Sequence, residues 1–86
     1  MNEGQGHNKD VRIIVNGREK VVTGKEISFD QVVALAFAQP PTGPNIVITV
    51  TYHRGHGDKP EGSLLPGGTI KVKEGMIFDV TATDKS

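Results

Sequence analysis

The 86-residue sequence predicts an α+β fold in which a mixed sheet of four to five strands packs on one helix. Alternating apolar runs at 11–15, 46–53 and 76–82 are typical of half-buried strands. A single stretch, 27–41, has helical spacing instead. The apolar residues are mostly Val and Ile, which favour strands. Because one helix cannot cover both faces of a sheet, it is expected on one side only.

The first strand, 11–15, is followed by Asn16-Gly17, a pair that signals a hairpin. A two-residue turn would place Lys20 on the same face as Ile13, an awkward partner. A three-residue loop, with the glycine in the left-handed conformation, would group Val21 with Ile13 and move Lys20 outside. The pattern therefore favours the three-residue loop.

The helix is predicted from its start and stop signals. Ser28 is a natural N-cap, and Gln31, three residues later, completes a capping box. Pro40 and Pro41 end the helix. One apolar stripe at helical spacing is expected to face the sheet: Phe29, Val32, Val33, Ala36 and Phe37.

After the helix come a strand at 45–53, a long Gly- and Pro-rich connection at 54–68, a short strand at 69–73 and a last strand at 76–82. A hairpin, a crossing helix and further strands are the order of a β-grasp fold, with the first and last strands parallel at the sheet centre. The expected organisation is a disordered segment, a domain and a flexible C-terminal tail, at 1–10, 11–82 and 83–86.

Composition excludes several functional classes. Lys plus Arg and Asp plus Glu each number 10, a balance that argues against nucleic-acid binding and a polybasic membrane anchor. No apolar run is long enough for a spanning helix, and the first ten residues do not read as a secretory signal, so a cytoplasmic protein is expected. The absence of cysteine excludes disulfides, cysteine-based zinc sites and a cysteine nucleophile.

The loop after the 45–53 strand invites two site hypotheses. His53 and His56, with Asp58 nearby, suggest a metal, but a fourth ligand is not evident. Arg54, Lys59 and glycine amides suggest an anion site, although the spacing is not that of a P-loop. A partner-contacting loop, involving Arg54 and His56, or a purely structural loop is favoured over both. No catalytic triad is visible, so the chain is not expected to be an enzyme.

Apolar residues on the minority faces of the strands are candidates for docking. Ile14, Val47 and Ile77 lie opposite the core side of their strands. Together with Leu64 or Leu65 they are expected to form an exposed patch for a partner or for another copy of the chain. The alternative is that the long loop folds back and covers them.

The combination of "VRIIVNGREKVV", "ISFDQVVALAF", "PPTGPNIVITVTYHRGHGDKPEGSL" and "VKEGMIFDVTATDKS" resembles the bacterial multiubiquitin-type domain family of ubiquitin-like proteins, over residues 10–86. The resemblance implies a modifier attached to targets through its C-terminus. It also implies three partners: an E1-like activating enzyme, an E2-like conjugating enzyme and a processing or deconjugating peptidase. The modifier needs no cofactor, because the activating enzyme binds the ATP.

The C-terminal sequence departs from the better-known ubiquitin pattern. Ubiquitin ends in Gly-Gly, whereas the conjugation tail expected here is Thr81, Ala82, Thr83, Asp84, Lys85 and Ser86. The only Gly-Gly, Gly67-Gly68, precedes a predicted strand and is interpreted as a turn. Either the activating enzyme accepts a bulkier tail or a peptidase first trims it.

A second functional hypothesis is a non-covalent β-grasp adaptor that binds through the exposed sheet face or the His/Gly loop. The missing Gly-Gly supports it, and the same feature disfavours a third hypothesis, sulfur carriage. For a covalent modifier, both an amide and an ester bond to the target are compatible with the chemistry.

Overall fold

The computed structural model describes residues 10–55, 57 and 60–84. Its elements are β2 (Asp10–Val15), β3 (Arg18–Thr23), β4 (Glu26–Ser28), α1 (Phe29–Ala36), β5 (Ile46–His53), β6 (Gly62–Leu64), β7 (Thr69–Lys71) and β8 (Ile77–Asp84). The one helix and the mixed sheet confirm the predicted fold class.

The main sheet has five strands in the order β3-β2-β8-β5-β6, with β4 and β7 as a separate antiparallel pair. At its centre β2 and β8 run parallel, with Ile14 opposite Ile77 and Val15 opposite Phe78. All other pairings in the main sheet are antiparallel. The two strands at the sheet centre are therefore the first and the last, as in a ubiquitin-like β-grasp fold.

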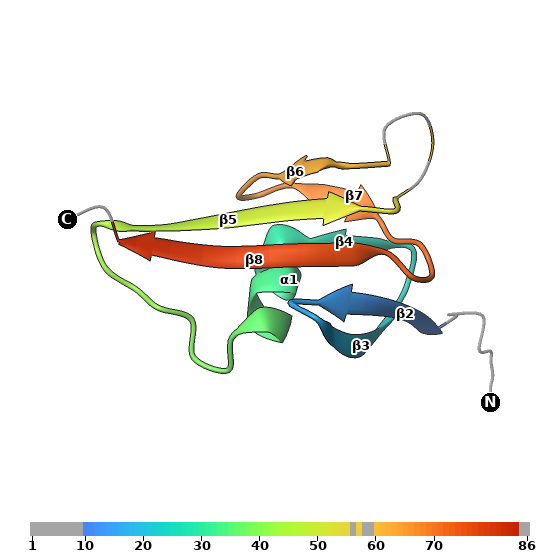
Figure 1. Ribbon diagram of the computed structural model, residues 1–86, viewed down its shortest axis with the longest axis horizontal. Helices are drawn as coiled ribbons and strands as arrows, with labels where there is room; N and C mark the ends of the chain where they lie inside the picture. Colours follow the sequence, from blue (N-terminus) through green and yellow to red (C-terminus); the bar gives the residue numbers. More distant parts are fainter. Residues whose placement is uncertain (1–9, 56, 58–59, 85–86) are drawn as a thin grey trace.

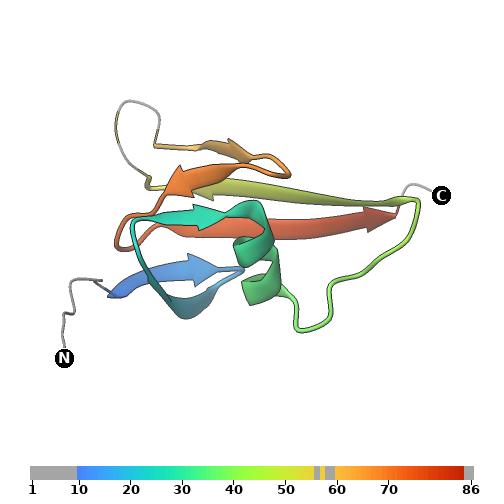
Figure 2. The ribbon, with the colours of Figure 1, turned by 180° about the vertical axis from the view of Figure 1, so that it is seen from behind.

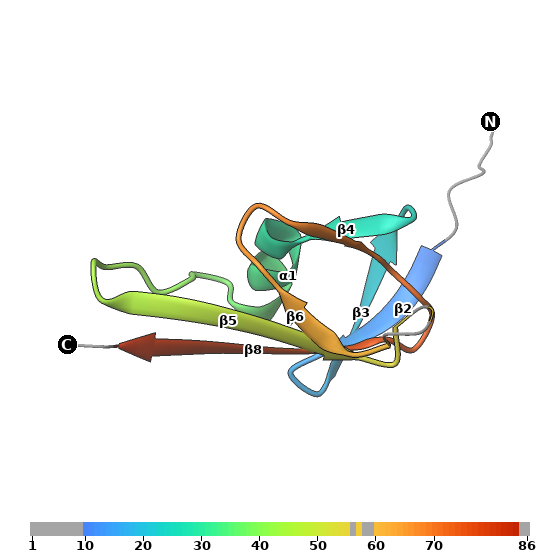
Figure 3. The same cartoon turned by 90° about the horizontal axis from the view of Figure 1, so that it is seen from above.

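The molecule has two layers, with the main sheet on one side (Figure 1) and α1 with the β4–β7 pair on the other (Figure 2). Between them lies a single buried cluster, whose fully covered side chains are Phe78, Ile13, Ile27, Met76, Val15, Val32 and Val50. The core takes alternate residues of β2 and β8, as expected for strands with one covered face. The opposite, outer face of the sheet is covered by no described element (Figure 3).

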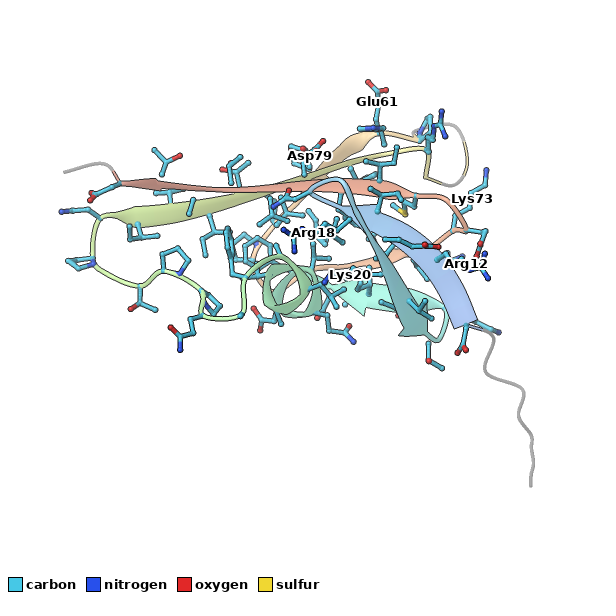
Figure 4. All side chains as sticks on the ribbon, turned by 60° about the horizontal axis from the view of Figure 1, so that its bottom comes forward. Arg12, Arg18, Lys20, Glu61, Lys73 and Asp79 are labelled. Carbon is cyan, nitrogen blue, oxygen red and sulfur yellow. The ribbon has the colours of Figure 1, made fainter. Side chains whose placement is uncertain are left out.

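The predicted hairpin register is wrong. The turn has two residues, and β2 pairs with β3 so that Ile13 lies opposite Lys20 and Arg12 opposite Val21. Asn16 and Gly17 both have positive φ, 51° and 80°, which suits a two-residue turn that follows the twist of the strands. Lys20 is on the α1 side of the sheet (Figure 4) and only partly buried, so its long stem packs while its ammonium stays in water.

The helix begins as predicted and ends earlier. The Ser28 side chain accepts a hydrogen bond from the Gln31 N–H at 3.1 Å, and the Gln31 side chain accepts one from the Ser28 N–H at 2.9 Å. This is the predicted capping box. The helix ends at Ala36, because Phe37 is already extended, with φ −130° and ψ 123°. The prolines at 40 and 41 therefore follow an end already formed.

Removing this cap is expected to cost stability. Ser28→Ala deletes the acceptor for the Gln31 N–H and should lower the free energy of unfolding by about 1 kcal/mol. Urea denaturation followed by circular dichroism measures the change. Ser63→Ala, at an exposed position of β6, is the matched control and should stay within about 0.5 kcal/mol of the original chain. Equal effects of the two substitutions would contradict the role of the cap.

Two short segments, β6 and β7, were assigned differently by sequence. β6 was expected to be part of the 54–68 loop, but it pairs with Val50–Tyr52 and forms the edge of the main sheet. The predicted strand at 69–73 exists as β7, yet it pairs with β4 rather than with the main sheet. Segments of three residues carry too little alternation to reveal which partner they pair with.

The domain boundaries also differ slightly from those predicted. Asp10, expected in the disordered segment, pairs with Thr23 as the first residue of β2. At the other end β8 continues to Asp84, two residues beyond the expected strand. Thr83 and Asp84 pair with Val47 and Ile46, so the described part of the predicted flexible tail is a strand.

Candidate functional site

The carboxyl end of β8 extends beyond the body of the domain together with the start of β5 (Figure 3). We call this two-stranded projection the arm, formed by residues 81–84 of β8 and 46–49 of β5, which pair antiparallel. All four β8 side chains of the arm are exposed. On the β5 strand, Ile46 and Ile48 are half-buried, and Ile48 packs against the margin of the core. The described part of the predicted conjugation tail, Thr81–Asp84, is thus one strand of the arm.

Asn16, at the end of β2, is joined by its side chain to the base of the arm. Its Oδ1 accepts a hydrogen bond from the Val80 N–H at 2.8 Å, and its Nδ2 donates to the Val80 carbonyl at 3.1 Å. The Asn16 backbone N–H also donates to the Phe78 carbonyl at 3.0 Å. The Asn16 side-chain amide thus makes the two hydrogen bonds to Val80 that the backbone of one further β2 residue would otherwise make. After Asn16 the chain turns into β3.

These bonds fix which way the backbone groups of β8 point. Phe78 and Val80 direct their peptide groups toward β2, so by alternation Ala82 does the same. Ile77, Asp79, Thr81 and Thr83 therefore pair with β5. The ladder with β5 runs the whole length of β8, whereas contact with β2 ends at Val80. Beyond Val80 the arm is a ribbon of two strands.

On the outer face, Ile14 and Ile77 lie side by side on the two central strands. Both are half-buried. Polar and charged side chains flank them on either side: Arg12 Nε lies 3.7 Å from Glu19 Oε2, and His53 Nδ1 lies 3.9 Å from Asp79 Oδ2. Asp79 points away from α1 (Figure 4). The structure thus brings together two of the residues predicted for partner docking, Ile14 and Ile77. Polar and charged side chains lie on both sides of them.

The remaining candidates do not join this pair. Val47 is 40% exposed but lies on the arm, six residues along β5 from the position opposite Ile77, or about 20 Å. Leu64 is 5% exposed and belongs to the core, so its predicted place in an exposed patch is wrong. Leu65 is 68% exposed just beyond β6, three strand positions from β2, or about 14 Å. A single contiguous patch is therefore not formed.

The loop after β5 begins with Arg54, which has a positive φ of 64°. His56 lies outside the described residues, as do Asp58 and Lys59. Arg54 lines a hollow together with His53, Gly55, Pro60, Glu61, Lys73, Glu74 and Gly75. Among the described residues that line this hollow, Glu61 and Glu74 balance the positive charges of Arg54 and Lys73.

Within the part of the chain that the structure describes, no three His, Cys, Asp or Glu side chains gather in a way that would hold a metal ion. Nor is any helix in that part long and apolar enough to cross a membrane.

The contribution of Asn16 was not predicted from the sequence. The Asn-Gly pair signals a turn, and the residue was interpreted only in that role. A polar side chain with both a donor and an acceptor at the end of a central strand is the signal that was available. A hydrophobic or acidic residue at this position would not satisfy both backbone groups of Val80.

Comparison with curated proteins and with solved structures found no match. Comparison with family sequence models found the multiubiquitin family, whose model matches residues 11–84. The match spans β2 to the end of β8 in the five-stranded β-grasp domain, and it confirms the resemblance suggested by the sequence. The chain therefore belongs to the multiubiquitin family.

Proposed function

We propose that the chain is a protein modifier that is activated at its C-terminal carboxylate and transferred to target molecules. The observation that carries the proposal is the projection of β8 from the centre of the sheet into the exposed arm. The described end of this arm, Asp84, projects from the body of the domain, so a second protein could enclose a carboxylate that follows it. Membership of the multiubiquitin family supports the same function.

The proposed chemistry needs no catalytic group on this chain. A carboxylate oxygen attacks the α-phosphorus of ATP bound to the activating enzyme, and pyrophosphate leaves. A cysteine thiolate of a partner enzyme then attacks the acyl adenylate, AMP leaves, and a thioester remains. A target amine or hydroxyl finally displaces the thiolate and loses its proton, which forms an amide or an ester. The chain supplies the acyl group and the docking surfaces, and we place the pathway in the cytoplasm, where ATP is available.

The conjugating enzyme and a processing peptidase complete the proposed pathway. The peptidase is included because the sequence ends in Thr83-Asp84-Lys85-Ser86, whereas ubiquitin ends in Gly-Gly. The activating site for this chain must therefore admit residues with side chains, or the peptidase must act first. Intact-mass measurement of the activated species distinguishes the two, since trimming removes whole residues.

The test compares the full chain with one truncated after Val80. Each carries an N-terminal tag and is co-expressed with its activating and conjugating enzymes. Tagged species of higher mass on a denaturing gel are expected only for the full chain. Truncation removes only exposed side chains among the described residues, so the fold should survive, and circular dichroism checks this. Adducts of the truncated chain would contradict the proposal, and so would their absence from the full chain despite active enzymes.

A second candidate function, the non-covalent adaptor, is favoured by one observation. Thr81–Asp84 are held in a strand rather than left as a free tail, and the Ile14–Ile77 pair offers an apolar contact on the outer face. Ile77→Thr distinguishes the two functions when a native pull-down through the N-terminal tag is run beside the denaturing gel. An adaptor would lose its partner with this substitution and keep it after truncation, whereas a modifier would keep forming adducts with Ile77→Thr and lose them after truncation.

A further inference from the structure

We infer that the arm opens at a fixed point, and that residues 81–84 of β8 separate from β5 as one segment to reach the activating enzyme, with the amide of Asn16 holding Val80 as the hinge. This rests on the proposed function, because it concerns how the same carboxylate becomes accessible.

Before Val80, β8 is held on three sides. Its backbone pairs with β2 and with β5, and Phe78 and Val80 are 0% and 4% exposed in the core. Separating this part from β5 would expose the centre of the core. We therefore expect that separating this part of β8 from β5 requires as much free energy as global unfolding.

After Val80, β8 continues its strand pairing with β5 and no longer pairs with β2. Thr81, Ala82, Thr83 and Asp84 are all exposed, so no side chain from this stretch leaves the core when the strands separate. A two-stranded ribbon alone is marginally stable in water. On the other strand, Ile48 remains packed against the core margin, and the Ile46 N–H donates to the Gly43 carbonyl at 3.3 Å. The β5 strand thus has contacts that stay in place when β8 leaves.

The Asn16 amide marks the boundary between these two parts. It satisfies both the N–H and the carbonyl of Val80, so the last anchored residue of β8 has a full set of backbone bonds even when Thr81 is released. Four released residues span at most about 14 Å when fully extended. An enclosed active site can therefore take in a segment of this length, together with any residues that follow it, while the domain stays folded.

Hydrogen exchange on the whole protein tests the opening without any enzyme. The amides of Ile77, Asp79, Thr81 and Thr83 all face β5 and form an internal series. We expect protection factors for Thr81 and Thr83 at least about tenfold below those for Ile77 and Asp79, a difference of about 1.4 kcal/mol. Equal protection along the series would show that the arm opens only with global unfolding and would overturn the inference.

Substitution of Asn16 tests the hinge. Asn16→Gly keeps the positive φ that the turn requires but removes the amide. The Val80 amide should then lose protection by at least about tenfold, while the β2–β3 amides keep theirs. Asn16→Asp, which also tolerates positive φ, keeps the acceptor for the Val80 N–H and should retain that protection. Unchanged protection of Val80 in the glycine variant would overturn the role of Asn16.

A reversible cross-link connects the opening to function. Ile48 and Ala82 are directly opposite in a pair without mutual backbone bonds, where Cα atoms lie about 4.5 Å apart, within the range for a disulfide. The natural chain has no cysteine, so Ile48→Cys with Ala82→Cys forms one defined bridge. The oxidised variant should support ATP–pyrophosphate exchange by the activating enzyme at least about tenfold more slowly than the same protein after reduction.

The outcomes separate this inference from the proposed function. Equal rates of ATP–pyrophosphate exchange with the oxidised and reduced forms would mean that the arm enters the enzyme with β5 and β8 still paired. That result would overturn the inference that β8 separates from β5. If the original chain itself supports no exchange with an active enzyme, the proposed function fails, and the protection factors still decide whether the arm opens at Val80.

Discussion

Phe78→Ala is expected to destabilise the domain by about 3–5 kcal/mol, the cost of truncating a fully buried aromatic ring. Phe78 is 0% exposed on the central strand, and its ring centroid lies 6.3 Å from that of Tyr52. Small domains have only about 5–15 kcal/mol of stability in total, so much of it would be lost. Urea titration and thermal melting measure the effect, with Tm falling by about 4–8 °C per kcal/mol.

The matched control is Leu65→Ala. Leu65 is also a large apolar residue, but it is 68% exposed, so its truncation should change the free energy of unfolding by less than about 0.5 kcal/mol. A loss below about 1 kcal/mol for Phe78→Ala would contradict the placement of this ring at the centre of the core.

Gly55→Ala is expected to cost about 1–3 kcal/mol, because the added methyl group meets atoms that cannot easily move. A Cβ at this position would lie 3.0 Å from the Pro60 carbonyl oxygen and 3.2 Å from Met76 Cε. The Gly55 N–H donates to that same oxygen at 2.7 Å, so relieving the contact weakens the bond that closes the base of the loop. Thermal melting of the variant measures the cost.

Gly62→Ala is the comparison for this prediction. Its added Cβ would lie 2.9 Å from the Tyr52 hydroxyl oxygen, which is nominally closer. That oxygen is the far end of a half-buried side chain, and a small rotation of the ring moves it away. A cost below about 1 kcal/mol is therefore expected, and a larger loss at Gly62 than at Gly55 would show that the loop base is not rigid.

Local signals in the sequence predicted those parts of the fold that depend on near neighbours. The Ser28–Gln31 capping box spans four residues and forms as predicted. The hairpin register failed because it was decided by the expected burial of side chains, with Lys20 judged unfit to lie opposite Ile13. The backbone geometry of Asn16 and Gly17 determines the register instead, because both residues adopt positive φ. The apolar stem of Lys20 also tolerates a partly buried position.

The candidate site was less predictable, because it depends on pairing between distant segments. Alternation correctly placed Ile14 and Ile77 on the face opposite the core, and the parallel central pairing then made them neighbours. The same alternation could not show that Leu64 pairs at the sheet edge and turns into the core, since β6 has only three residues. The extension of β8 from Ala82 to Asp84 was missed because Thr83 and Asp84 carry no apolar pattern, and only pairing with β5 makes them part of the strand.

The central position of β8 also has a consequence for synthesis on the ribosome. Because β8 lies between β2 and β5, a nascent chain that stops before Ile77 has two separate half-sheets with no strand to join them. Pairings between residues far apart in sequence form slowly and late, so the domain is expected to fold only after its last strand has emerged. Incomplete translation products would then stay unfolded and open to proteolysis. Completion of folding would thus coincide with the appearance of the arm that the proposed pathway uses.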